Sequence, residues 1–68
     1  MKQVLLKDLK QGDYFTLKDY GEYPNDSVVW VRDFYSREAK KYCIYKFSDT
    51  NHDSLKSGNT KVYTDFTF

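Results

Sequence analysis

The stretch VVWVRDFYSREAKKYCIYKF, residues 28–47, decides the fold of this chain. Its two halves are rich in β-branched and aromatic residues, which favour strands. The polar tetrapeptide SREA between them, residues 36–39, has the length of a hairpin loop built round a type I turn. The stretch therefore predicts an antiparallel hairpin. It also holds six of the chain's thirteen aromatic side chains and five of its eleven Lys and Arg residues.

Three further strands are predicted outside the hairpin. QVLLKDL, residues 3–9, is short and apolar and is followed by a turn that contains Gly12. DYFTLK, residues 13–18, alternates with a period of two and places Phe15 and Leu17 on one side. TKVYTDFTF closes the chain with the same alternation, and one of its two sides carries Val62, Thr64, Phe66 and Phe68.

The two remaining segments are predicted to be loops. Residues 19–27, DYGEYPNDS, contain the single Pro, a Gly and three acidic side chains. Residues 48–59, SDTNHDSLKSGN, are polar and rich in turn-forming residues, and they allow one short helical turn at residues 49–55. Five short strands without an amphipathic helix indicate an all-β fold.

We expect these strands to form a single domain over residues 1–68. A chain this short buries only roughly 60% of its unfolded surface, and its many aromatic side chains compensate in part because each buries roughly 150–250 Å². A small five-stranded SH3-like barrel would close the sheet and limit its exposed edges. A strongly bent antiparallel meander is the alternative.

The composition excludes several classes of protein. Cys43 is the single cysteine, so no intrachain disulfide can form, and this usage is typical of a reducing compartment. One Cys and one His cannot build a four-ligand zinc site. No apolar run approaches the roughly 20 residues of a membrane span, and the N-terminus lacks the apolar region of a secretory signal. We therefore expect a cytoplasmic chain without a metal or cofactor.

The predicted loop assigns the hairpin residues to two faces. With the loop at residues 36–39, Val31 lies opposite Ile44 and Trp30 lies opposite Tyr45, and cross-strand neighbours share a face. One face, predicted to be the core, carries Val29, Val31, Tyr35, Tyr42 and Ile44. The other, predicted to face outward, carries Trp30, Arg32, Lys41, Cys43 and Tyr45. A loop shifted by one residue would mix the two sets.

The predicted outward face combines aromatic and basic side chains. Such a β-surface can stack bases while its cations contact phosphates, as small barrels do with single strands. Trp30 and Tyr45 could instead be a cross-strand pair that supports the hairpin, or anchors of a protein interface. The candidate binding residues are Trp30, Arg32, Arg37, Lys40, Lys41, Tyr45 and Lys46. On this assignment Trp30→Ala removes binding and leaves the fold intact.

The charge distribution permits local binding without strong overall attraction. The net charge is only +1, but residues 28–47 carry five basic and two acidic side chains, whereas residues 19–27 carry three acidic ones and no base. No catalytic constellation is recognisable: His52 lacks a nucleophile in a known context, and Cys43 has no CxxC companion. We predict a non-enzymatic module that binds nucleic acid. A protein-interaction module or inhibitor, or a homodimer that uses the same face, is the alternative.

Two resemblances add to this interpretation. LKDLKQGDYFTL, residues 6–17, resembles the entry to small barrel domains, including KOW-like modules of translation factors and related SH3-like modules. Through GDYFTLK, VVWVRDFY, KKYCIYKF followed by SDTNH, and the ending VYTDFTF, the chain is similar to small proteins of Bacteroides-type bacteria and of their phages or mobile elements. That group has no assigned activity and supplies no site residues. The resemblance implies a cytosolic accessory protein, encoded by a phage or mobile element.

Overall fold

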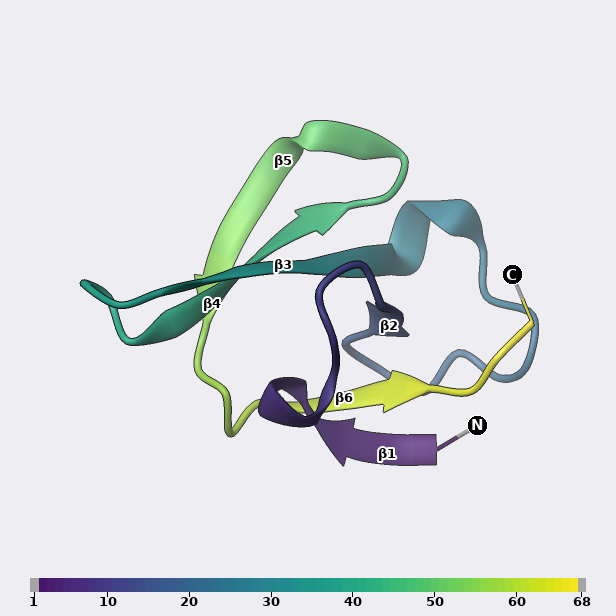
Figure 1. Ribbon diagram of the computed structural model, residues 1–68. Helices are drawn as coiled ribbons and strands as arrows, with labels where there is room; N and C mark the ends of the chain where they lie inside the picture. Colours follow the sequence, from purple (N-terminus) through teal and green to yellow (C-terminus); the bar gives the residue numbers. More distant parts are fainter. Residues whose placement is uncertain (1, 68) are drawn as a thin grey trace.

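The computed structural model describes residues 2–67 and shows one antiparallel sheet (Figure 1). The strands are β1 (Lys2–Leu5), β2 (Tyr14–Thr16), β3 (Val29–Ser36), β4 (Lys41–Lys46), β5 (Asp49–Lys56) and β6 (Lys61–Thr64). Their order across the sheet is β1-β6-β2-β3-β4-β5, so β2 to β5 form a meander and β6 returns to lie between β1 and β2. The all-β prediction is confirmed.

The sheet is open rather than closed into a barrel. β1 and β5 are its two edges, and the described residues contain no pairing between them. In Figure 1 the β1–β6 pair crosses the lower part of the view and β5 rises at the top, with β3 between them, so the sheet is strongly bent. No helix within residues 2–67 is long and apolar enough to cross a membrane.

The prediction of a loop with a helical turn at residues 48–59 is wrong for most of that segment. Residues 49–56 form β5, a strand that the sequence did not predict, after a two-residue turn at Phe47 and Ser48. Tyr45 lies opposite Asp53 and Lys46 lies opposite Asp49, which leaves residues 50–52 as a bulge. Polar, turn-forming residues become a strand here because pairing with β4 satisfies their backbone groups, and tertiary pairing overrides weak local propensity.

The predicted register of the β3–β4 hairpin is also wrong. Ser36 pairs with Lys41, and the turn comprises residues 37–40, one position later than predicted. Lys40 closes this turn with a φ of 56°, a left-handed conformation that sequence rules reserve chiefly for Gly and Asn. Trp30 therefore lies opposite Lys46 rather than Tyr45.

This register exchanges the faces of several residues. Trp30 shares a face with Phe15, its cross-strand neighbour on β2, and packs against the buried cluster of Leu6, Phe15, Ile44 and Val62. We call this the inner face. Val29 and Val31 are buried, as predicted, but they lie on the opposite, outer face, since they alternate with Trp30 along β3. Val31 is flanked there by Tyr14 and Tyr45.

A short 3₁₀ helix, η1 (Leu6–Asp8), covers the inner face. Leu6 is fully buried, and its backbone N–H donates to the carbonyl of Thr60 at 2.9 Å. The backbone N–H of Lys7 donates to the carbonyl of Gly58 at 3.0 Å. The chain after β1 is thereby attached to the turn before β6, and Val4 pairs with Val62 beside it. Residues from both ends of the sequence close the core.

The C-terminal strand is shorter than predicted. β6 ends at Thr64, because Asp65 adopts a left-handed conformation with a φ of 64° that breaks the extended run. The backbone N–H of Thr67 then donates to the carbonyl of Glu22 at 2.7 Å, which attaches this segment to the acidic loop. Phe68, which the alternation included in the strand, lies outside the described residues.

The packing of Trp30 changes the expected effect of Trp30→Ala. Since the indole packs against the buried cluster, its removal should lower the free energy of unfolding by about 2–4 kcal/mol, a little less than for a fully buried Trp. Urea denaturation followed by far-UV circular dichroism measures the change. Leu55→Ala is the control, because Leu55 is 45% exposed and its loss should cost far less. Equal midpoints for the two variants would contradict the inner position of Trp30.

Candidate nucleic-acid interface

The inner face of the hairpin, near its turn, carries three stacked side chains. The guanidinium carbon of Arg32 lies 4.4 Å from the centre of the Tyr42 ring, on its face. The ring of Tyr35 contacts that of Tyr42 in an edge-to-face arrangement, with centroids 4.8 Å apart. We call Arg32, Tyr35 and Tyr42 the tip cluster.

A β-bulge creates the tip cluster. In a regular strand Arg32 and Tyr35, three positions apart, would point to opposite faces. The pairing with β4 shifts between them, since Arg32 lies opposite Ile44 and Tyr35 opposite Tyr42. The extra residue in β3 reverses the alternation and returns Tyr35 to the side of Arg32. Bulges commonly redirect side chains in this way beside functional sites.

Arg32 stacks on an aromatic ring and has no anionic partner among residues 2–67. Its Nε atom is buried, and no described residue accepts a hydrogen bond from it. The neighbouring carboxylate of Asp33 instead accepts a hydrogen bond from Gln11 at 3.3 Å. A buried donor without an acceptor costs about 1–3 kcal/mol, and more when it is charged. Within residues 2–67 no carboxylate is paired with Arg32, and the exposed part of its side chain is accessible to an anion.

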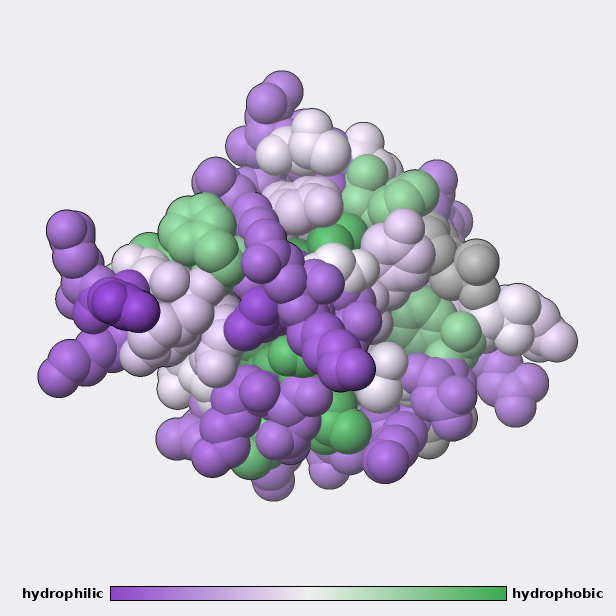
Figure 2. Space-filling model, in the orientation of Figure 1, coloured by the Kyte–Doolittle hydropathy of each residue, from purple (hydrophilic) through white to green (hydrophobic). Residues whose placement is uncertain are grey.

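Further cations surround the tip cluster. Arg37 and Lys40 lie exposed in the turn, and Lys41 follows at the start of β4. Lys56 on β5 lies opposite Tyr42 and shares its face. In Figure 2 strongly hydrophilic side chains project from the end of the molecule where Figure 1 places the β3–β4 turn. Of the predicted basic residues, Arg32 contacts the Tyr42 ring, Arg37 and Lys40 lie in the adjoining turn, and Lys41 alternates with Tyr42 along β4 and so lies on the outer face.

A second group forms around Trp30. The ammonium nitrogen of Lys46 lies 5.9 Å from the centre of the Trp30 ring. His52, from the bulge of β5, contacts the same ring edge to face at 5.6 Å. Trp30 and Arg32 occupy successive inward positions on β3, so the two groups adjoin. Trp30 and Lys46 were predicted together, whereas nothing in the local sequence pointed to His52.

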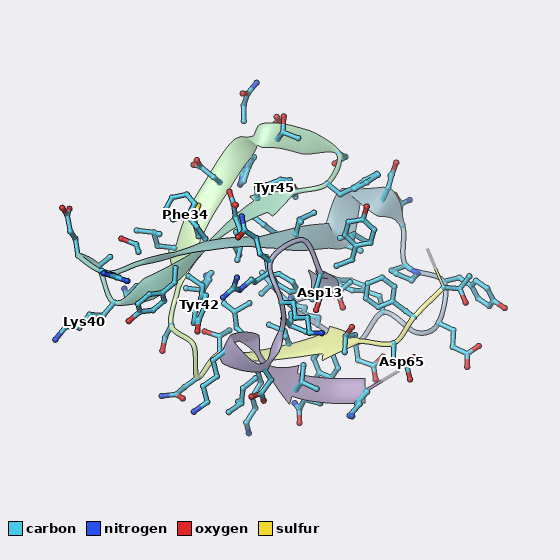
Figure 3. All side chains as sticks on the ribbon, in the orientation of Figure 1. Asp13, Phe34, Lys40, Tyr42, Tyr45 and Asp65 are labelled. Atoms are coloured by element: carbon cyan, nitrogen blue, oxygen red, sulfur yellow. The ribbon has the colours of Figure 1, made fainter. Side chains whose placement is uncertain are left out.

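Tyr45 does not belong to either group. It lies opposite Val31 and Asp53, on the outer face. Figure 3 shows Phe34 and Tyr45 on one side of the β3–β4 hairpin and Tyr42 on the other. The predicted pairing of Tyr45 with Trp30 is therefore wrong. The aromatic partner of the basic residues is Tyr42, which the sequence pattern had assigned to the core together with Tyr35.

The outer face has the opposite electrostatic character. Burial raises the pKa of the Cys43 thiol above its ordinary value, and the carboxylates of Asp33 and Asp53 raise it further. Cys43 lies opposite Leu55 on β5, and both Leu55 and Phe34 are exposed. This face is apolar and acidic, so it is poorly suited to phosphates.

No family model, no curated protein and no solved structure matches this chain. Within residues 2–67, no three His, Cys, Asp or Glu side chains gather in a way that could hold a metal ion. The site formed by these residues consists of aromatic rings in contact with cationic side chains.

We expect Gly58→Ala to disturb the tip cluster, because Gly58 lies against the Tyr42 ring. A Cβ atom on Gly58 would lie 2.9 Å from Cε2 of Tyr42 and 3.1 Å from Cβ of Lys7, so the ring must move. Overpacking of this kind costs about 1–3 kcal/mol. Urea denaturation gives the loss, and near-UV circular dichroism shows whether the tyrosine rings shift. Asn59→Ala, in the same turn and exposed, is the control and should change neither.

The acidic outer face predicts slow alkylation of Cys43. Because burial, Asp33 and Asp53 raise the pKa of the thiol, its rate of reaction with iodoacetamide should rise with pH later than that of a free cysteine. The folded state then retains a proton that the unfolded state has lost, so stability falls as pH rises past the ordinary thiol value. Asp53→Asn should move the rate profile to lower pH, and Asp49→Asn should not. Identical profiles for the two variants would refute the role of Asp53.

Proposed function

We propose that this chain binds single-stranded nucleic acid through the tip cluster and the cations around it. The observation that carries the proposal is the guanidinium of Arg32, which is stacked on Tyr42 and has a buried Nε–H without an acceptor. A phosphate oxygen can accept hydrogen bonds from the exposed part of this side chain, and hydrogen bonds between guanidinium and phosphate are among the stronger ones in proteins.

The rings beside Arg32 support the same ligand. Tyr35 is 44% exposed, so its ring can stack on a base. The edge-to-face contact with Tyr42 keeps the Tyr35 ring in position. Base–aromatic stacking contributes about 1–3 kcal/mol per base and tolerates every base, because each has a π-face. Bases are accessible to such rings when they are unpaired, which favours a single strand over a duplex. Arg37 and Lys40 lie in the turn toward which the backbone would continue.

The charge difference between the two faces supports this orientation. Arg32 and Lys56 share the inner face with the rings, whereas Asp33 and Asp53 lie near Cys43 on the outer face. A phosphate backbone is attracted to the first face and repelled by the second. The net charge of +1 limits the number of phosphates that are contacted, so the affinity depends on few contacts.

A protein partner on the outer face is a second candidate. Phe34 is 55% exposed and Leu55 is 45% exposed, and β5 is an unpaired edge of the sheet. Exposed edges and apolar side chains favour association with another chain. This partner could be a second copy, which light scattering would detect as a dimer.

We further propose that the sheet is an open relative of SH3-like barrels and that the chain acts in the cytoplasm as an accessory protein of a phage or mobile element. The return of the chain after β5, which pairs β6 with β2 at the other side of the meander, supports the first part. The single cysteine and the resemblance to proteins of Bacteroides-type bacteria support the second.

Tyr35→Ala is the sharpest test of nucleic-acid binding. Loss of one stacking ring should weaken binding of a labelled, mixed-sequence DNA single strand by about 1–3 kcal/mol, as measured by fluorescence anisotropy. Phe34→Ala is the matched control: the residue is adjacent and more exposed, but its side chain lies on the outer face. Binding should also weaken with salt, with a log–log slope of about −2 to −3 if three or four phosphates are contacted.

Each outcome separates the two candidates. Absence of binding at low salt would end the nucleic-acid proposal. If Tyr35→Ala and Phe34→Ala weaken binding of the strand equally, the tip cluster is not the binding site. A protein complex that is insensitive to salt and is lost with Phe34→Ala would favour the outer face instead.

A further inference from the structure

A small hollow of about 210 Å³ opens beside Trp30. It lies between the long loop that follows β2, the start of β3 and the end of β4. Its lining residues are Leu17, Lys18, Tyr20, Ser27, Val28, Trp30 and Lys46. Pockets that bury drug-sized ligands measure about 300–1,000 Å³, so this hollow has room for a single ring system whose substituents remain outside.

The walls of the hollow are suited to a flat ring. Trp30 and Tyr20 supply two aromatic side chains, and Leu17 and Val28 supply apolar ones. Trp30 is fixed by its packing against the buried cluster, whereas Tyr20 is 46% exposed on the loop. One rigid and one exposed aromatic wall can therefore enclose a planar group.

The polar groups of the hollow are suited to an anion. Lys18 and Lys46 both line it, and the ammonium of Lys46 lies over the Trp30 ring at 5.9 Å. The nearest carboxylates in sequence are engaged in turns: Asp19 accepts from the backbone N–H of Gly21 at 3.0 Å, and Asp49 accepts from that of Asn51 at 3.2 Å. Among the described residues, neither lysine forms an ion pair.

We propose that this hollow takes one base of the bound single strand, with the adjoining phosphates on Lys18 and Lys46. The inference rests on the proposed function and extends it to a second contact point. Lys46 moves from the Trp30 ring to a phosphate as the base takes its place, and the cation–π contact it gives up is worth only about 0.5–1 kcal/mol at exposed sites.

The hollow and the tip cluster lie along one line. Trp30 and Arg32 are successive inward residues of β3, and such positions are roughly 6–7 Å apart along a strand. This separation is within the reach of one nucleic-acid strand, which would contact the partly exposed sides of Trp30 and Arg32 from outside the buried cluster. The hollow then sets the position of one base, while Arg32 and Tyr35 contact its neighbours toward the β3–β4 turn.

Trp30 is the only tryptophan of the chain, so its fluorescence reports on the hollow directly. The probe is an oligothymidine of about ten nucleotides, within the site sizes of small single-strand binders. We expect its addition to quench the Trp30 emission. The quenching should saturate at the concentration at which anisotropy of the same strand, labelled at one end, also saturates.

Variants in the loop after β2, and of the lysines that line the hollow, test whether the hollow itself contributes to binding. Tyr20→Ala should weaken binding about 5- to 150-fold, the equivalent of one lost stacking contact. Tyr23→Ala is the matched control, since Tyr23 lies in the same loop, is 76% exposed and does not line the hollow. Lys18→Gln and Lys46→Gln should each reduce the magnitude of the salt slope by about 0.7. Lys61→Gln, the same charge change on β6, should leave the slope unchanged.

The outcomes distinguish this inference from the proposed function. If the labelled strand binds while Trp30 emission stays constant and Tyr20→Ala behaves as Tyr23→Ala, the hollow is excluded and the tip cluster stands. If no strand binds by either readout at low salt, both are overturned. Far-UV circular dichroism of every variant verifies the fold. The two lysine variants, which remove no aromatic packing, decide the question if Tyr20→Ala unfolds.

Discussion

The backbone conformation of residues 32–41 determines which side chains of the β3–β4 hairpin share a face, and the core and the candidate site depend on that arrangement. Lys40 closes the β3–β4 turn in a left-handed conformation, and a bulge between Arg32 and Tyr35 adds one residue to β3. Since the side-chain period of a strand is two, the extra residue of the bulge reverses which residues of β3 share a face with those of β4, whereas the later turn alone would leave the face sets unchanged. The bulge thereby places Trp30 on the face of Ile44 and brings Tyr35 beside Arg32.

The resulting sheet has two faces of different chemistry. Near the turn, the inner face joins tyrosine rings to Arg32 and Lys56, while the outer face joins exposed Phe34 and Leu55 to carboxylates. The segregation explains how a chain of almost zero net charge can present a basic surface. It also explains why the core can be small: η1 covers the middle of the inner face, and the aromatic side chains at its ends are only partly buried. Those partly buried rings are the ones available for stacking.

Much of the fold followed from local pattern, and the site followed only in part. The strands around Phe15, Val31, Ile44 and Val62 were predicted because alternation of apolar residues is a strong signal. β5 was missed because its polar residues carry no such signal and become a strand only by pairing with β4. Tyr42 packs against the core as predicted, but Arg32 was assigned to the opposite face, because no pattern in the sequence marks the bulge that places it on the side of Tyr42.

The sequence by itself determined the all-β class, the hairpin and the concentration of aromatic and basic residues within it, since β-branched and aromatic residues favour strands wherever they pair. Only the tertiary structure decided which rings meet which cations. A shift of one residue in pairing exchanges every side chain between the faces. That shift comes here from the bulge between Arg32 and Tyr35, which appears only in the pairing of β3 with β4 and which no local pattern in the sequence marks.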